Sequence, residues 1–190
     1  AGGRVAAVNR GAKRSFESVV VEIDGDEAAS FERYSAEQAR ALTADAIKAQ
    51  LLESGQWTSL RARPFGRVAD PQTAPTGLFI TAIDTHPHAP NPEIAIARER
   101  EAFVLGQDLL AAMVECPVYL CAAPGADIPQ GEHARLARHD FSGPHPAGLA
   151  GTHVHFLMGA SLERIAWTVG YQDVIAIGRL FLDGALYTDR

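Results

Sequence analysis

The chain has 190 residues, of which 47% are hydrophobic and 21% are charged; this composition is typical of a folded globular protein and excludes a disordered one. Its net charge of −6 argues against a nucleic-acid partner, because proteins that bind the phosphate backbone carry a basic face. No apolar run approaches the roughly 20 residues that span a bilayer, and the first residues lack the apolar core of a secretory signal.

Two runs near the start of the chain are rich in apolar and β-branched residues. They cover residues 4–8 and 16–23, and turn-forming residues lie between them at 9–11. This pattern predicts a β-hairpin, which is too small to be stable alone. The chain also begins without methionine and ends on an extended stretch, so we expect it to be a piece of a longer protein.

Helix-start signals follow the hairpin. Ser35 with Gln38 three residues later forms a capping-box pattern. A second start at Thr43 predicts a helix that runs to about Glu53, and Gly55 is a natural stop for it. Residues 56–75 are then predicted to be a loop.

Three arginines, Arg61, Arg63 and Arg67, lie in that predicted loop close to a tryptophan and a phenylalanine. Locally this cluster is typical of a nucleic-acid patch. Because the whole chain is acidic, a solvated or partner-facing loop is the favoured interpretation.

An apolar run at 78–83, a helical pattern at 101–115 and a second apolar run at 118–122 predict a βαβ unit with parallel strands. The later segments predict a strand, a helix or tight turn, a strand and a helix, at 134–141, 148–157, 165–169 and 173–182. The predicted fold class is therefore α/β, a Rossmann-like domain with a parallel sheet, preceded by a β-hairpin.

The two cysteines, Cys116 and Cys121, flank an apolar run. Their spacing matches no zinc or redox motif. We therefore predict core thiols and a reducing, cytoplasmic compartment.

Histidines gather in two parts of the chain, at His86 and His88 and at His145, His153 and His155. Several imidazoles could hold a metal, but two histidines two residues apart share a face only on a strand. Residues 148–157 are more typical of a helix, and no carboxylate cluster lies nearby. Hydrogen bonding and support of loop structure are the favoured roles for these histidines, and no metal site is expected.

Residues 141–153 are dense in glycine and proline. This density specifies a fixed backbone path. The glycines could cradle a phosphate at the start of the following helix, but the spacing matches neither a dinucleotide-binding nor a P-loop motif. A shaped loop that faces a partner or an apolar headgroup is the preferred interpretation.

Five long stretches carry a resemblance to a known family: VNRGAKRSFESVVVEIDG, LLESGQWTSLRARPFGRV, FITAIDTHPHAPNP, FSGPHPAGLAGTHVHF and AWTVGYQDVIAIGRLFLDGALYTDR. In this order they resemble the A subunit of sodium-translocating NADH:quinone reductases. The resemblance implies a peripheral subunit on the cytoplasmic face of the bacterial inner membrane. The complex would pass electrons from NADH to ubiquinone and export sodium. The implied partners are the other subunits, especially the quinone-side membrane subunit.

That subunit is similar to the C subunit of the Rnf complex and to the flavin-binding subunit of respiratory complex I. The resemblance therefore implies three domains. Residues 1–30 would end a barrel-sandwich hybrid unit, residues 31–183 would form a Rossmann-like domain without flavin, and residues 184–190 would begin a β-grasp-like domain that is cut short.

In the flavin-binding relatives, a glycine-rich loop after the first helix holds the FMN phosphate. The matching stretch here has no glycine between Gly55 and Gly66, so the bare backbone that a phosphate approaches is missing. In these relatives, the next strand ends in an acidic, asparagine-containing segment that contacts flavin and NADH. This chain matches only the acid of that segment, at Asp84. We therefore expect neither FMN nor any other tightly bound cofactor. The alternatives are a flavin- and NADH-binding subunit like these relatives, and a ligand-free interaction module.

The A subunit of the family is linked to ubiquinone, the substrate of the complex. The resemblance points to five residues for contact with a quinone headgroup or a neighbouring subunit: His145, Pro146, Gly148, His153 and Tyr171. Histidine could donate a hydrogen bond to a quinone carbonyl. No catalytic residue is predicted within the chain.

Overall fold

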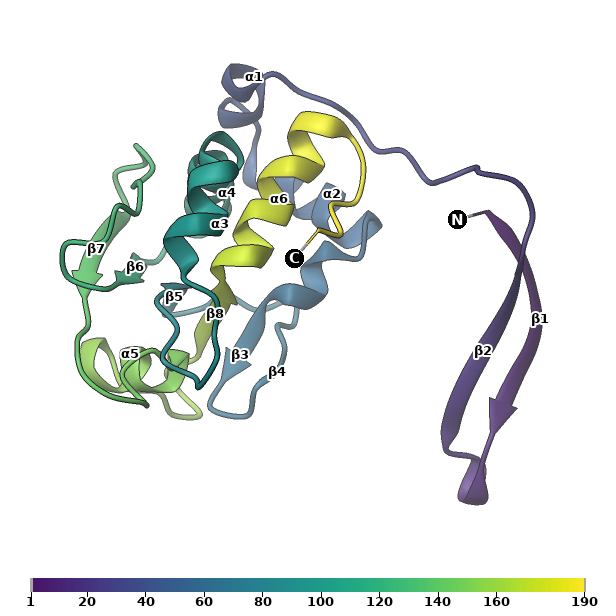
Figure 1. Ribbon diagram of the computed structural model, residues 1–190, viewed down its shortest axis with the longest axis horizontal. Coiled ribbons are helices and arrows are strands. Elements are labelled where there is room, and N and C mark those ends of the chain that lie inside the picture. The colour runs from purple at the N-terminus through teal and green to yellow at the C-terminus, as the bar shows by residue number, and fades with distance from the viewer. Residues whose placement is uncertain (1, 190) are drawn as a thin grey trace. The chain divides into compact units, whose positions relative to one another are not determined.

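A computed structural model describes residues 2–189, which divide into two compact units, Ala1–Phe31 and Glu32–Arg190. The first is a hairpin of β1 (Gly3–Arg10) and β2 (Phe16–Ile23), paired antiparallel (Figure 1). The predicted hairpin is confirmed. Its turn was predicted wrongly: pairing continues to Arg10 opposite Phe16, and the chain reverses through a 3₁₀ turn at Ala12–Arg14.

The hairpin leaves its apolar side chains exposed. No residue in the described range 2–31 is fully buried. The exposed large apolar residues of the hairpin are Val5, Val8, Phe16, Val19, Val20, Val21 and Ile23. Two strands cannot bury such side chains between them, since each face of a two-stranded sheet is open.

The second unit, as far as residue 189, is built on one six-stranded sheet in the order β4-β3-β8-β5-β6-β7. Four strands run parallel: β5 (Gly77–Ala82), β6 (Val118–Ala122), β7 (Leu136–Asp140) and β8 (Ala166–Gly170). The predicted α/β class with a largely parallel sheet is confirmed. Because β6 and β8 lie on opposite sides of β5, the strand order reverses there, and a crevice is expected beyond the carboxyl ends of β5 and β8.

The interpretation of residues 56–75 as a loop was wrong in part. The segment forms a 3₁₀ turn at Gln56–Ser59 and two short strands, β3 (Arg61–Arg63) and β4 (Arg67–Val68). Strand β3 pairs antiparallel with both β4 and β8. Strands of two or three residues rich in arginine carry no hydrophobic period, so sequence periodicity could not detect them.

Six helices complete the described part of the second unit: α1 (Ala36–Arg40), α2 (Ala44–Glu53), α3 (Pro92–Arg98), α4 (Arg100–Met113), α5 (Ala150–Leu157) and α6 (Tyr171–Asp183). The capping box of Ser35 and the cap of Thr43 are both confirmed. Helix α6 begins two residues before its predicted start, and α3 was missed. The sequence does carry a start signal for α3, because Asn91 caps this helix and Pro92 occupies its first turn. Among residues 2–189, no helix is both long and apolar enough to cross a membrane.

Helices α4 and α6 lie side by side and contact the sheet, and α3 packs against both of them (Figure 1). Glycines allow α4 and α6 to touch backbone to backbone. A Cβ at Gly106 would collide with the carbonyl oxygen of Val174, and one at Gly178 with that of Ala102. This contact fixes the position of α6. It therefore also fixes the first turn of α6, which directly follows β8.

Helix α5 packs on an aromatic and apolar cluster of the sheet. The rings of Phe79 and Tyr119 stack with centroids 4.5 Å apart, and Val154 packs against Phe79 and Cys121. Cys121 is a core thiol as predicted, and burial raises its pKa to about 12. Cys116 is only half-buried.

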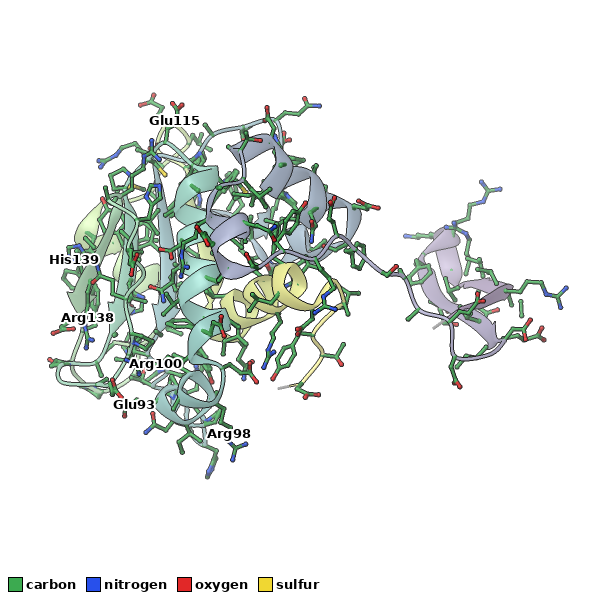
Figure 2. All side chains as sticks on the ribbon, turned by 90° about the horizontal axis from the view of Figure 1, so that it is seen from above. Glu93, Arg98, Arg100, Glu115, Arg138 and His139 are labelled. Carbon is green, nitrogen blue, oxygen red and sulfur yellow. The ribbon has the colours of Figure 1, made fainter. Side chains whose placement is uncertain are left out.

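Strand β7 forms one edge of the sheet, where Figure 2 labels Arg138 and His139. The Arg138 guanidinium donates to the carbonyls of Ala123, Ala126 and Ile128 at 3.0–3.2 Å. It thereby fixes the chain that leaves β6.

Candidate functional site

A cavity of about 640 Å³ lies where β5 and β8 end. Thr81 and Asp84 line it from the end of β5, and Gly170 and Tyr171 from the end of β8. We call it the switch-point cavity, because strand order reverses between these two strands. Open α/β sheets bind their ligands at this place, and the volume falls within the range of small-molecule sites.

Strand β3 supplies the basic wall of the switch-point cavity. Arg61 and Arg63 alternate with Ala62 along the strand, so both side chains lie on one face, and both line the cavity. Arg67 does not line it; its guanidinium lies 5.6 Å from the ring centroid of Phe65. The basic cluster seen in the sequence is therefore split between a cavity and the surface.

Two helices begin at the switch-point cavity. Leu149 and Ala150 at the start of α5, and Gly170 and Tyr171 at the start of α6, all line it. The N-cap residues of these helices, Leu149 and Gly170, provide no side-chain acceptor for the first-turn N–H groups. The first-turn N–H groups and the positive end of the helix dipole favour negative charge at such a place.

Asp84 and His86 form a hydrogen-bonded pair on the cavity wall. The Asp84 Oδ1 atom lies 2.6 Å from His86 Nδ1 and accepts from the His86 backbone N–H at 2.9 Å. Burial acts to raise the pKa of Asp84, but the His86 hydrogen bonds and nearby imidazoles hold it below its usual value. The ring of His86 lies 4.9 Å from that of His145.

The predicted contact residues His145, Pro146 and Gly148 belong to one surface loop. His145 and Pro146 are exposed, and His145 Nδ1 lies 3.3 Å from the Thr85 hydroxyl. Gly148 is buried and its N–H donates to the same hydroxyl at 2.9 Å. A Cβ at Gly148 would come within 2.6 Å of the Thr85 nitrogen, so only glycine fits this close approach.

His153 lies beneath the loop and not on its surface. It is fully buried, and its Nε2 lies 2.9 Å from the carbonyl of Ala147. Since a carbonyl only accepts, Nε2 carries the proton, and the buried Nδ1 has no hydrogen-bond partner among residues 2–189. Burial lowers the pKa of His153. Its ring lies 4.3 Å from that of Phe141, so it supports the loop from inside.

Tyr171 lies between two hollows. It lines the switch-point cavity and also a groove of about 520 Å³ between α3 and α6. The groove is richer in apolar side chains, including Pro90, Ile94, Ala95 and Ile175. The Tyr171 hydroxyl accepts from Gln172 at 3.4 Å, and burial raises the pKa of the phenol.

The structure therefore separates the five predicted residues. Gly148 and Tyr171 line the switch-point cavity, His145 and Pro146 lie on the adjoining loop, and His153 lies below that loop. Sequence reasoning missed the cavity role of the β3 arginines. The available signal was the alternation in Arg61-Ala62-Arg63, which places two like residues on one face of a strand.

The stretch that replaces the flavin-phosphate loop uses its backbone internally. The N–H of Thr58 donates to the carbonyl of Gly55, and that of Leu60 to Trp57. These two donors are not free to bind a phosphate, and the expectation that FMN is not bound stays a prediction. Within residues 2–189, no three histidine, cysteine, aspartate or glutamate side chains are grouped to hold a metal.

Residues 42–186 match the family described as the NqrA second alpha/beta domain. The chain belongs to the NqrA family. It is 51% identical over 190 residues to a protein of Shewanella amazonensis and 50% identical to one of Vibrio parahaemolyticus, each named as the A subunit of the Na(+)-translocating NADH-quinone reductase. The chain spans 42% of the length of each. The resemblance stated from the sequence is confirmed, and nearly all of the switch-point cavity and the α3–α6 groove lies within the NqrA match.

Proposed function

We propose that this chain is part of the A subunit of a sodium-translocating NADH–quinone reductase. There it acts as a peripheral scaffold and ubiquinone contact on the cytoplasmic face of a bacterial membrane. The observation that carries the proposal is the 51% identity, over all 190 residues, to a relative with that printed name. The relatives' name supplies NADH and quinone as the substrates of the complex.

The surface loop supports a docking role. We call residues 142–148 the docking loop. Its residues 142–146 are all exposed, yet its backbone is fixed from within: Ala147 N–H donates to Pro144, and Leu149 N–H and the Thr152 hydroxyl both donate to Pro146. A loop ordered before binding loses little entropy when a partner docks. The proposed partner is the quinone-side membrane subunit.

The α3–α6 groove supports a quinone contact. A quinone headgroup needs apolar walls with a few hydrogen-bond donors for its carbonyls. Ile94 and Ile175 supply apolar surface, and the Tyr171 phenol supplies a donor. Tyr171 is therefore the predicted residue that fits a headgroup best, whereas His145 and Pro146 fit subunit docking.

The test uses the assembled complex with single substitutions in this subunit. Tyr171→Phe is expected to raise the KM for a short-chain ubiquinone by roughly 3- to 10-fold, as for one lost hydrogen bond. His145→Ala is expected to lower the yield of assembled complex. His155→Ala, an exposed histidine outside the docking loop, serves as the matched control. An unchanged KM in Tyr171→Phe together with unchanged assembly in His145→Ala would contradict the proposal.

The position of the switch-point cavity favours a second candidate, a flavin- and NADH-binding subunit. Flavin absorbance in the purified full-length subunit would establish it and overturn the expectation of no FMN. A pure interaction module would instead show loss of assembly with His145→Ala and no KM change with Tyr171→Phe.

A further inference from the structure

Three segments of the second unit meet around a small hollow. The turn between β3 and β4 supplies Pro64, helix α5 supplies His155, and the loop after α5 supplies Ala160 to a hollow of about 250 Å³. Figure 1 shows α5 and the turn between β3 and β4 at the same end of this unit. We call the surface around the hollow, residues 63–67 and 155–164, the α5 face. We propose that the α5 face binds directly to an anionic lipid bilayer, which goes beyond the proposed function, in which the docking loop binds a protein subunit.

The α5 face carries the three most exposed large hydrophobic side chains in the described part of the second unit. Phe65, Phe156 and Leu162 are 66%, 73% and 75% exposed. They come from the three segments that meet at the hollow, so they gather on one surface. Single exposed apolar residues are common, whereas a group of large ones marks a contact surface.

Two of these side chains project from turns that hydrogen bonds hold in place. The N–H of Gly66 donates at 2.8 Å across the turn that carries Phe65. The N–H of Ser161 donates to the carbonyl of Arg164 at 3.2 Å across the turn that carries Leu162. Protein partners pack best on apolar side chains that fill well-packed pockets. Side chains that project from ordered turns suit a fluid bilayer, which they enter at little cost in chain entropy.

Positive charge accompanies the apolar side chains. The arginines of the α5 face are Arg63, Arg67 and Arg164, and its one acid is Glu163. The whole chain, in contrast, carries a net charge of −6. The Arg67 guanidinium lies 5.6 Å from the ring centroid of Phe65, so a cation lies beside the aromatic side chain at the tip of the turn. Apolar side chains that enter the acyl region and arginines that meet anionic headgroups together bind a membrane surface.

The first experiment mixes the isolated full-length subunit with lipid vesicles and separates bound from free protein by flotation. Vesicles of phosphatidylcholine with phosphatidylglycerol are expected to bind the subunit at least about 10-fold more tightly than vesicles of phosphatidylcholine alone, because each arginine near an anionic surface contributes favourably. No other subunit is present, so this result is independent of docking and of quinone contact. Absence of binding to the mixed vesicles, or equal binding to both kinds, would overturn the proposal.

A matched pair of variants then locates the apolar contact. Leu162→Ser is expected to weaken binding to the mixed vesicles about 10-fold or more, as for the loss of one inserted apolar side chain. Leu52→Ser is the control and is expected to bind as wild type, because Leu52 is an exposed leucine on α2, outside the α5 face. Each variant is first checked by thermal melting; substitutions at exposed positions change stability little.

The arginines are tested separately. The double variant Arg67→Gln with Arg164→Gln is expected to lower binding to the mixed vesicles about 10-fold or more, and to leave binding to phosphatidylcholine unchanged. Arg100→Gln is the control, because Arg100 lies on α4 (Figure 2). Wild-type vesicle affinity in the folded Leu162→Ser and double-arginine proteins would contradict the proposal. If Leu162→Ser lowered the yield of assembled complex but kept wild-type vesicle binding, the α5 face would bind a protein subunit instead, and the proposal would be wrong.

Discussion

Two regions of the α/β unit hold buried polar atoms whose hydrogen-bond partners differ. On helix α4, Gln107 and Asp108 are almost fully buried and hydrogen-bonded to the segment 129–133. At the switch-point cavity, Arg63 Nε and the Thr81 hydroxyl are buried without a partner in residues 2–189. Paired buried groups stabilise a fold, whereas unpaired ones reduce its stability.

The comparison shows which buried polar groups should stabilise this fold and which should reduce its stability. The α4 pair joins helices and a loop far apart in the chain, so its removal should cost folding energy. Arg63 Nε and the Thr81 hydroxyl have no partner in the described chain, so their removal should be tolerated by the fold. Three predictions test this contrast, and a fourth tests the buried His153, in order of decreasing effect on stability.

Asp108→Ala should be the most damaging change. One carboxylate oxygen pairs with Arg40 at 2.9 Å, and the other accepts from the N–H groups of Glu132 and His133. Removal of one partner of a buried pair leaves the others unsatisfied, so we expect a loss of about 3 kcal/mol in the free energy of unfolding. Urea denaturation measures it. Asp127→Ala, at an exposed pair with Arg100, should lose less than about 0.5 kcal/mol; equal losses would refute the contrast.

Gln107→Leu should have the second largest effect. The amide donates to the carbonyl of Pro129 at 3.0 Å and accepts from the N–H of Gly131 at 3.2 Å. Leucine fills similar space but satisfies neither group, so a loss of about 1.5 kcal/mol is expected in the same urea experiment. A loss below that of the exposed control would show that these bonds are dispensable.

A pH dependence should come from His153 beneath the docking loop. Burial lowers its pKa in the folded state, so the unfolded chain binds the proton more readily. Stability is then full above the unfolded pKa of about 6.5 and falls as the pH drops through the folded pKa. Melting temperature followed between pH 7.5 and pH 5 should decline, and His153→Gln should flatten the curve. An identical decline in the variant would assign the effect to other groups.

Thr81→Val should leave stability unchanged or raise it by up to about 1 kcal/mol, because the buried hydroxyl that it removes has no partner in the described chain. Thermal melting of the free subunit measures this effect. A loss comparable to that of Gln107→Leu would mean that the hydroxyl is satisfied in the folded protein, and the distinction between the two regions would fail.

Much of the fold could be predicted because its signals are local. The Ser35 capping box, the Thr43 cap and the apolar runs that became β5, β6 and β8 all depend on neighbouring residues. Helix α3 was missed although Asn91 and Pro92 marked its start, because its seven residues carry too short an apolar pattern to stand out between the predicted strand and the predicted helix at 101–115.

The candidate site was predictable only in part. The glycine- and proline-rich segment correctly indicated a shaped loop, and Gly148 and Tyr171 do line a cavity. The burial of His153 could not be read from its spacing, because it depends on how α5 packs beneath the loop. A histidine on a short helix can face either the core or the solvent.

The sequence by itself determined the NqrA family, the α/β class and the ends of most helices, since these depend on residues close together in the chain. Only the tertiary structure decided the place of Arg61 and Arg63. Strand β3 pairs with β8, so Arg61 lies opposite Thr168, which is 107 positions later in the chain. No local period encodes a contact of that span, because it is set by the closure of the whole sheet.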